Sequence, residues 1–519
     1  MCPLNMEMIS SITNPFSIER IHSSYLKCRK GKKNSYNAIR FQTNLFSELR
    51  NLSESLLKKT YQPSRSICFY FEKPKLREVI AADFKDRVVH RLLVDILEPE
   101  YEKSFIKDSY ACRKEKGTQA AVKRLKEFIS SGTRKAKAPL YYLQLDIKGY
   151  FFEIDKVILM KILSKKVKDE NILYLAKTII EHDPTEKFVY KGKIPPRGTL
   201  PPHKTLFHPN KRKGLPIGNL TSQFFANLYL NELDQFVKRN LGVKSYLRYM
   251  DDFILLSDSK EELLEFREKI KNYLTDNLQL TQKESDKEPI SIYKGIDFLG
   301  YFIKPRYTLI RRRVVANMKK ALKESLPPKP RIKNEIQHIN FFPDFGSWKR
   351  LQARVNSYLG HFKYANTAKL IENIKKCIRP FYPFLQIKNG SLQIFPKRPD
   401  RFRTLHSQIY AFRRLTPSTV LIVETGRFFN VYNLSQFDLS LLLNQKWLRR
   451  KYNRAMNEKD SRRQIIKHIG VHYKYLNKLI RFLQINFFTG IILKQMQKMK
   501  ESILLRSVVY RWGFLFSAF

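Results

Sequence analysis

Cysteine is scarce in this chain, and its few cysteines lie far apart. The sequence has five among 519 residues, at Cys2, Cys28, Cys68, Cys112 and Cys377. None belongs to a Cys-x-x-Cys pair, the spacing that is typical of structural zinc sites. We therefore expect neither a zinc site nor a disulfide framework, and a reducing compartment such as the cytoplasm.

The sequence also lacks an apolar run long enough to cross a membrane. The longest late run, from Ile485 to Leu493, is too short to span a bilayer and is broken by Thr489 and Gly490. No secretory signal is visible at the N-terminus. We therefore expect a cytoplasmic protein without a membrane partner.

Acidic residues are outnumbered about two to one by basic residues. The chain has 47 Asp and Glu against 98 Lys and Arg, which gives a formal net charge of +51. Nucleic acid is the first candidate for an anionic partner, because its phosphates form a dense line of negative charge. A basic soluble protein without that partner is the plainer alternative. The basic residues are spread along the whole chain, which disfavours an acidic membrane surface.

Apolar residues make up 43% of the chain, which is enough for buried cores in two to four domains. The residue patterns predict the following elements. Helices are expected over 83–101, 219–240 and 260–275, strands over 68–71, 79–82, 141–147 and 298–303, a hairpin over 246–256, and a loop over 182–213.

Two adjacent carboxylates stand at the turn of the predicted hairpin. Asp251 and Asp252 have apolar flanks on both sides, so their mutual repulsion is poorly screened and a bound cation would relieve it. Asp146 ends another predicted buried strand. If these strands pair, the three carboxylates meet at one sheet edge. Such an oxygen-rich site suits two Mg²⁺ ions, or Mn²⁺, that support an in-line phosphoryl displacement.

Four motifs, in this order, resemble those of reverse transcriptases. They are LDIKGYFF at 145–152, GLPIGNLTSQ at 214–223, YMDD at 249–252 and FLGY at 298–301. The resemblance covers about residues 25–370. Segment 83–90 resembles the helix that opens the fingers of group II intron and retroelement enzymes, and segment 357–367 resembles the thumb of diversity-generating retroelement enzymes. The C-terminal extension is more similar to defence-associated bacterial reverse transcriptases of the unknown group.

The resemblance implies an α+β right-hand polymerase fold and an RNA-directed DNA polymerase. The fold would comprise an N-terminal helical segment (1–60), fingers (61–140), a palm with an antiparallel sheet (141–305, with an insertion around 182–213), a helical thumb (306–379) and a basic, mainly helical C-terminal extension (380–519) that binds RNA. The expected partners are an RNA template that includes a structured noncoding RNA, the cDNA product and dNTPs, with homo-oligomers left open.

The resemblance also implies residue roles. Asp146, Asp251 and Asp252 would be catalytic, and with Ile147 would hold the metal ions. The nucleotide would be bound by Lys75, Arg77, Arg113, Phe151, Ile217, Gly218 and Lys283, and the primer and template by Tyr249, Met250, Phe298, Leu299, Gly300 and His361.

Two of these positions bear on specificity. Phe151 would be an aromatic gate that clashes with a ribose 2′-hydroxyl, although a core phenylalanine is the plainer interpretation. Ile217 stands where many reverse transcriptases have glutamine, which favours a low-fidelity lineage. Three functions stay open: a polymerase working with a noncoding RNA in antiphage defence, the mutagenic enzyme of a diversity-generating retroelement, and a non-catalytic RNA-binding protein with a retained palm.

Overall fold

The computed structural model divides the chain into two compact units. The first comprises Met1–Leu299 and Ile303–Arg306, and the second Gly300–Phe302 and Tyr307–Phe519. The described residues are 14–32, 35–72, 75–135, 139–195, 199–208, 210–283, 288–326, 331–333, 336–338, 345–378, 385–394, 420–425, 428–432, 445, 455–459, 465–475, 478–479, 481–482, 490–495 and 506–512.

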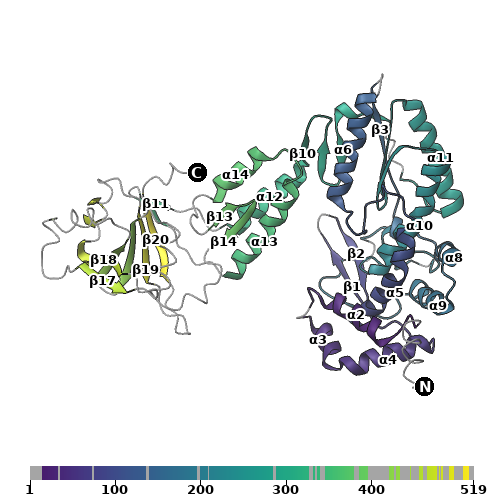
Figure 1. Cartoon of the computed structure of the whole chain (residues 1–519), viewed down its shortest axis with the longest axis horizontal. Coiled ribbons are helices and arrows are strands. Elements are labelled where there is room, and N and C mark those ends of the chain that lie inside the picture. Colours follow the sequence, from purple (N-terminus) through teal and green to yellow (C-terminus); the bar gives the residue numbers. More distant parts are fainter. Residues whose placement is uncertain are drawn as a thin grey trace, which may run out of the picture. The chain divides into compact units, whose positions relative to one another are not determined.

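The first unit opens with three helices, α2 (Ile18–Arg29), α3 (Tyr36–Thr43) and α4 (Leu45–Leu57), and the long α5 (Phe84–Glu102) follows after two strands (Figure 1). Asp83 caps α5, because its side chain accepts a hydrogen bond from the Lys85 amide. Its second oxygen accepts one from Asn37 Nδ2 at 2.8 Å, so the cap also ties α3 to the start of α5.

The first unit also contains a three-stranded sheet, in the order β2-β1-β4. It contains β1 (Ser66–Phe71), β2 (Arg77–Ala81) and β4 (Phe188–Tyr190), with β4 parallel to β1. The prediction of a loop over 182–213 was therefore wrong for Phe188–Tyr190. These three residues are aromatic and β-branched, and they gain ladder hydrogen bonds along β1. The rest of that segment contains only the short 3₁₀ helix η1 (Pro202–Lys204) among its described residues.

The central sheet of the first unit has the order β5-β6-β3-β7. Its strands are β3 (Tyr141–Asp146), β5 (Ser245–Tyr249), β6 (Asp252–Ser257) and β7 (Ile290–Ser291). All four residues from Phe253 to Leu256 are buried, so both faces of β6 are covered. Helices α6 (Thr118–Lys135) and α11 (Lys260–Leu278) contact this sheet, and α10 (Leu220–Gln235) continues into a π-helical turn at Phe236–Asn240 (Figure 1).

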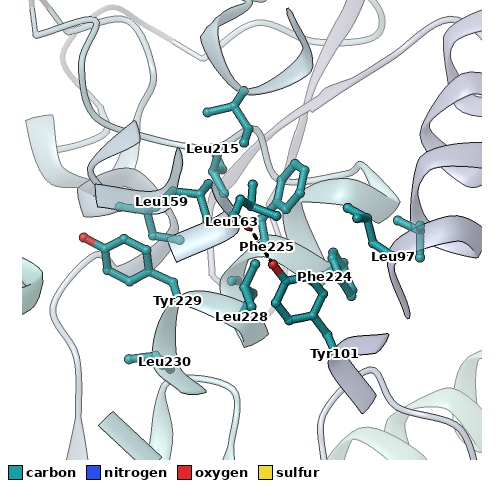
Figure 2. Close-up of a cluster of buried hydrophobic side chains, with 14 of the residues drawn as sticks. Leu97, Tyr101, Leu159, Leu163, Leu215, Phe224, Phe225, Leu228, Tyr229 and Leu230 are labelled. Atoms are coloured by element: carbon teal, nitrogen blue, oxygen red, sulfur yellow. Dashed lines mark hydrogen bonds between the residues drawn. The ribbon is translucent and has the colours of Figure 1, made fainter. Parts of the chain in front are cut away.

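The main core joins α5 and α10 to the short helices α7 (Tyr150–Glu153), α8 (Lys156–Lys166) and α9 (Glu170–Glu181). Figure 2 shows Tyr101 of α5 against Phe224 of α10, with ring centroids 5.9 Å apart. The Tyr101 hydroxyl donates to the Leu163 carbonyl at 3.1 Å, so this buried ring leaves no polar atom without a partner.

The chain enters the second unit through β8 (Ile296–Phe298), β9 (Tyr301–Ile303) and β10 (Thr308–Ile310). The prediction of one strand over 298–303 was wrong, because Leu299 and Gly300 both have positive φ, +50° and +90°, and interrupt it. Three helices follow: α12 (Arg312–Ser325), α13 (Phe345–Phe362) and α14 (Ala368–Ile378). They agree with the helical, basic pattern of the sequence.

A hairpin of β13 (Leu385–Lys388) and β14 (Ser391–Ile394) packs on α13. The Asn356 amide joins the two, since its Nδ2 donates to the Leu392 carbonyl at 3.1 Å and its Oδ1 accepts from the Leu392 amide at 2.6 Å.

The expectation of a mainly helical C-terminal extension was wrong for the described residues, which are mostly strands. An eight-stranded sheet is formed by β11 (Arg331–Lys333), β12 (Ile336–His338), β15 (Val420–Thr425), β16 (Phe428–Tyr432), β17 (Ala455–Lys459), β18 (Ile465–His472), β19 (Gly490–Gln495) and β20 (Arg506–Trp512). Its buried side chains, such as Val420, Ile422 and Val431, are β-branched residues that suit a pleated sheet. Much of the extension that is expected to bind RNA, including residues 395–419, 433–444 and 446–454, lies outside the described residues. No helix in the described part of the chain combines the length and apolarity that crossing a bilayer requires.

Candidate active site

Strand pairing brings the three predicted aspartates to one edge of the central sheet. In the register of β3 and β6, Asp146 lies opposite Asp252. Tyr249, at the end of β5, lies opposite Asp252 on its other side. The chain reverses at Met250, whose φ of +59° is left-handed, and Asp251 follows in the same turn. Two carboxylates on adjacent strands and one in the turn therefore share this edge.

The carboxyl group of Asp251 lies in an environment that disfavours its charge. Burial, and then the negative charge of Asp146, raise its pKa from 3.8 to about 6, while the positive charges of Arg77 and Arg248 act in the opposite direction. The ionised form of Asp251 is therefore unfavourable in free energy, and a neighbouring cation would remove that cost.

The donor chemistry of this edge fits divalent metal ions. Asp146 and Asp251 repel each other as anions, and hard cations such as Mg²⁺ prefer carboxylate and carbonyl oxygens. Asp252 would add a third carboxylate, and Ile147, which follows Asp146, would offer its main-chain carbonyl. Within the described residues, no three His, Cys, Asp or Glu side chains already form a metal-binding cluster. The assignment of ligands stays a prediction from chemistry.

Lys283 lies directly against the first of these aspartates. Its Nζ is 3.1 Å from Asp146 Oδ2, and its amide donates to the Asp146 carbonyl at 2.9 Å. Both side chains are partly exposed, at 54% and 39%. The predicted nucleotide-binding lysine is thus beside the catalytic edge, where its ammonium occupies a cation position on Asp146.

Arg77 and Lys75, the two basic residues expected in the fingers, lie at different places in the structure. Arg77 begins β2 with an exposed side chain, and its charge lowers the pKa of Asp251, which places the guanidinium near the catalytic turn. Lys75 lies in the connection between β1 and β2 and is exposed. Both are available to the phosphates of a nucleotide.

Arg113, also predicted to bind nucleotide, is engaged within its own loop. Its side chain is only 6% exposed and lies 2.6 Å from Glu102 Oε1. The guanidinium also donates to the carbonyls of Ile106 and Ser109, at 2.7 and 2.8 Å, and lies over the Phe105 ring. With its donors engaged in this way, Arg113 braces its own loop.

Phe151 and Ile217 lie on two segments that are joined by main-chain hydrogen bonds. The Phe151 carbonyl accepts from the Leu215 amide at 2.7 Å, and the Ile217 carbonyl accepts from the Ile80 amide at 3.0 Å. Both side chains are half-buried. The Ile217 side chain packs on a small cluster that contains Ile80 and Phe152. This side chain therefore contributes apolar surface and makes no hydrogen bond.

The backbone conformation and the packing at position 218 require glycine. Its φ is +128°, and a Cβ there would lie 2.8 Å from Cγ1 of Val79. Next to it, the Asn219 side chain accepts from the Ala82 amide at 2.9 Å. Gly218 is exposed, and its contact with the nucleotide stays a prediction.

Of the residues predicted to contact primer and template, Tyr249 and Met250 lie at the catalytic edge. The Tyr249 hydroxyl is 3.2 Å from Thr118 Oγ1, and Met250 is half-buried in the turn. Phe298 has no exposed surface. The prediction that it touches the primer was wrong, because its ring is a core residue.

The other three residues of this group surround the β8–β9 turn. Leu299 and Gly300 form the turn and are half-buried. The His361 ring stacks on Tyr301, with centroids 4.2 Å apart, and its Nδ1 is 3.0 Å from the Tyr301 hydroxyl. The prediction that His361 contacts the hybrid is not supported, because the imidazole is engaged within the second unit.

Sequence reasoning missed an ion pair beneath the catalytic turn. Arg248 and Asp234 are both fully buried, and Arg248 Nη2 is 2.6 Å from Asp234 Oδ2. The signal was present, since Arg248 interrupts an otherwise apolar predicted strand. A lone charge in a buried strand needs a buried counter-ion.

Residues 58–303 match the family described as "Reverse transcriptase (RNA-dependent DNA polymerase)". Among curated proteins, the chain is 24% identical over 318 residues to Protein YkfC of Escherichia coli, a match covering 54% of this chain and 78% of YkfC. It is also 24% identical over 363 residues to the group II intron-encoded protein LtrA of Lactococcus lactis, covering 57% of this chain and 56% of LtrA.

The chain thus spans just over half the length of LtrA. Among solved structures, apo telomerase from Candida tropicalis matches 62% of this chain and 57% of its own, with 12% sequence identity and a TM-score of 0.38.

Proposed function

We propose that this chain, whose residues 58–303 match the reverse transcriptase family, is an RNA-directed DNA polymerase that uses a two-metal site and copies a dedicated noncoding RNA in antiphage defence. Asp146, Asp251 and Asp252 would hold the metal ions, together with the Ile147 carbonyl. When bound, two such ions lower the pKa of a primer hydroxyl and neutralise departing pyrophosphate.

The observation that carries this proposal is the geometry of the catalytic edge. Asp146 and Asp252 lie opposite each other on two adjacent strands, Asp251 is half-buried in the turn beside them, and the charge of Arg77 lowers its pKa. Anionic oxygens for the metal ions thus lie within electrostatic range of an exposed cation for the triphosphate. This is the pairing that nucleotidyl transfer needs.

Primer extension on an RNA template tests the chemistry. We expect the wild-type chain to incorporate dNTPs with Mg²⁺, and Asp251→Asn to lose at least about a hundredfold in kcat. Asp276→Asn, an exposed aspartate on α11, is the matched control and should retain activity. Equal activity of Asp251→Asn and the wild type would exclude the proposed site.

The noncoding RNA and the defence role rest on charge and on family resemblance. The net charge of +51 exceeds what a short duplex in a polymerase cleft would neutralise, which favours a large folded RNA. Sequencing the RNA and cDNA that copurify with the chain tests this. One recurrent structured RNA with a cDNA copied from it supports the proposal, and protection of cells from phage tests the biological role.

The mutagenic enzyme of a diversity-generating retroelement is the second candidate, and Ile217 is the residue that favours it. An aliphatic side chain there cannot donate a hydrogen bond near the template–nucleotide pair, so fidelity would be low. A cDNA copied from a repeat and scattered with substitutions would favour this candidate. A double variant, Asp251→Ala with Asp252→Ala, that retained biological function would instead favour a non-catalytic RNA-binding role.

A further inference from the structure

An open pocket of about 410 Å³ lies on the first unit, between the segment after Asp146 and the loop that contains η1. Its lining is rich in hydrogen-bond donors and cations. Lys148, His203, His208, Asn210 and Lys213 all face it.

Strand pairing connects this pocket to the catalytic edge. Ile147 is bridged to Gln282 in antiparallel fashion, the Lys283 amide donates to the Asp146 carbonyl, and the Lys148 amide donates to the Thr281 carbonyl. In an antiparallel ladder, the residues immediately before and after a bridged pair have their side chains on the same face of the sheet.

Asp146 and Lys283 therefore share a face with Lys148 and Thr281, about 7 Å further along. The first pair is in the catalytic site, and the second pair lines the pocket. That spacing is within the reach of a diphosphate group. One end could remain near Asp146 while the other enters the pocket.

The charge of the pocket favours an anion. Its one carboxylate, Glu153, is already 3.0 Å from Lys213 Nζ, which leaves the exposed Lys148 as excess positive charge. Burial lowers the pKa of His208, so its imidazole is neutral at pH 7 and can donate one N–H. Together with His203, these groups offer several hydrogen-bond donors to a phosphate group. They would bind it less tightly than a cluster of arginines would.

The loop that completes the pocket is fixed against the first motif. Gly149 has a φ of +57°, and a Cβ there would lie 2.5 Å from the His203 carbonyl oxygen. Only glycine allows this approach. His203 is therefore carried beside the catalytic strand by main-chain packing, so its side chain can be removed without displacing the loop.

We propose that this pocket receives the pyrophosphate released by nucleotide addition. In that reaction, a primer 3′-hydroxyl oxygen bonds to the α-phosphorus, the bond from that phosphorus to the β-phosphate oxygen breaks, and the hydroxyl proton leaves to solvent. Pyrophosphate carries away the bonding electrons as negative charge. The proposal rests on the polymerase function proposed above, and it assigns the leaving group a site that Lys148 and His203 provide.

Calorimetric titration of inorganic pyrophosphate into the full chain, with Mg²⁺ and without nucleic acid, tests the pocket directly. We expect Lys148→Ala and His203→Ala each to weaken binding by about tenfold. Lys161→Ala, an exposed lysine on α8, should leave it unchanged. Unchanged affinity in both pocket variants, or inorganic phosphate binding as tightly as pyrophosphate, would overturn the proposal.

Product inhibition of DNA synthesis supplies the second readout. In the pocket variants, the inhibition constant of pyrophosphate should rise about tenfold while the KM for dNTP changes less than about twofold. An equal rise in both constants would overturn the leaving-group assignment. A chain that binds pyrophosphate through Lys148 but incorporates no dNTP would leave the pocket standing and overturn the polymerase function instead.

Discussion

The guanidinium of Arg248 donates a hydrogen bond to the main-chain carbonyl of Met250, 3.1 Å away, from a position with no exposure to solvent. The same side chain is bound by both oxygens of Asp234 and contacts Ser109 and Asn227. Met250 has a left-handed backbone, which is costly for a residue with a side chain. Arg248 therefore holds the turn that carries the catalytic aspartates.

This arrangement predicts that stability and activity can be separated. Arg248→Met should cost about 3–5 kcal/mol, because it leaves Asp234 buried without a counter-ion. The double variant Arg248→Met with Asp234→Leu should recover most of that stability in denaturant unfolding. Its kcat in primer extension should stay low, because nothing then fixes the Met250 carbonyl. Recovery of both properties would show that the pair acts only in folding.

The raised pKa of Asp251 predicts a stability that depends on pH when no divalent ion is present. Its pKa is about 6 in the folded chain against 3.8 for the free group. Between those values the folded state binds more protons, so stability falls as pH rises through this window and levels off above about 6. The charged carboxylate thus destabilises the metal-free protein at neutral pH.

Asp251→Asn should accordingly stabilise the metal-free chain at pH 7.5 by up to about 3 kcal/mol, and by less at pH 4.5. Unfolding in urea with a chelator at the two pH values measures this. Asp276→Asn serves as control. A stabilisation that is the same at both pH values would mean that charge burial is not its cause.

The Lys283–Asp146 contact predicts competition with metal ions. Removing the ammonium in Lys283→Met should tighten the binding of Mn²⁺ by up to about fivefold, a modest change because the pair is partly exposed. Lys271→Met, an exposed lysine on α11, is the matched control. Metal titration by calorimetry measures both. Weaker binding in Lys283→Met would indicate that the lysine orders the carboxylate instead of competing for it.

Phe151 is predicted to select the sugar. Replacing its half-buried ring in Phe151→Ala should raise the ratio of kcat/KM for rNTP to that for dNTP by about tenfold or more, since the clash with a 2′-hydroxyl is removed. A loss of folded protein would lower both kcat/KM values equally and leave their ratio unchanged, so the ratio needs no separate control for folding. An unchanged ratio would leave Phe151 as a core residue next to Tyr150, whose ring lies 5.6 Å away.

The sequence was most informative where a strong local pattern met a chemical requirement. Asp146 and Asp251 stand at the ends of apolar strands, so the pattern predicted both the sheet edge and its charge. The ion pair of Arg248 was missed because its counter-ion, Asp234, lies on helix α10, and the local pattern around Arg248 does not identify that partner. The eight-stranded sheet was missed because short apolar runs mixed with lysine suit a helix equally well, and because it includes distant pairings such as β12 with β20.

The sequence assigned Arg77 and Arg113 the same role in nucleotide binding, but the structure places their side chains in different environments. Arg77→Ala should raise the KM for dNTP about tenfold or more with little effect on unfolding, since the side chain is exposed. Arg113→Ala should instead destabilise the chain by about 1–3 kcal/mol, since Glu102 and two carbonyls lose their donor. Steady-state kinetics and unfolding of both variants form the test. If Arg113→Ala raised the KM for dNTP without loss of stability, its guanidinium would have to leave Glu102 to bind nucleotide.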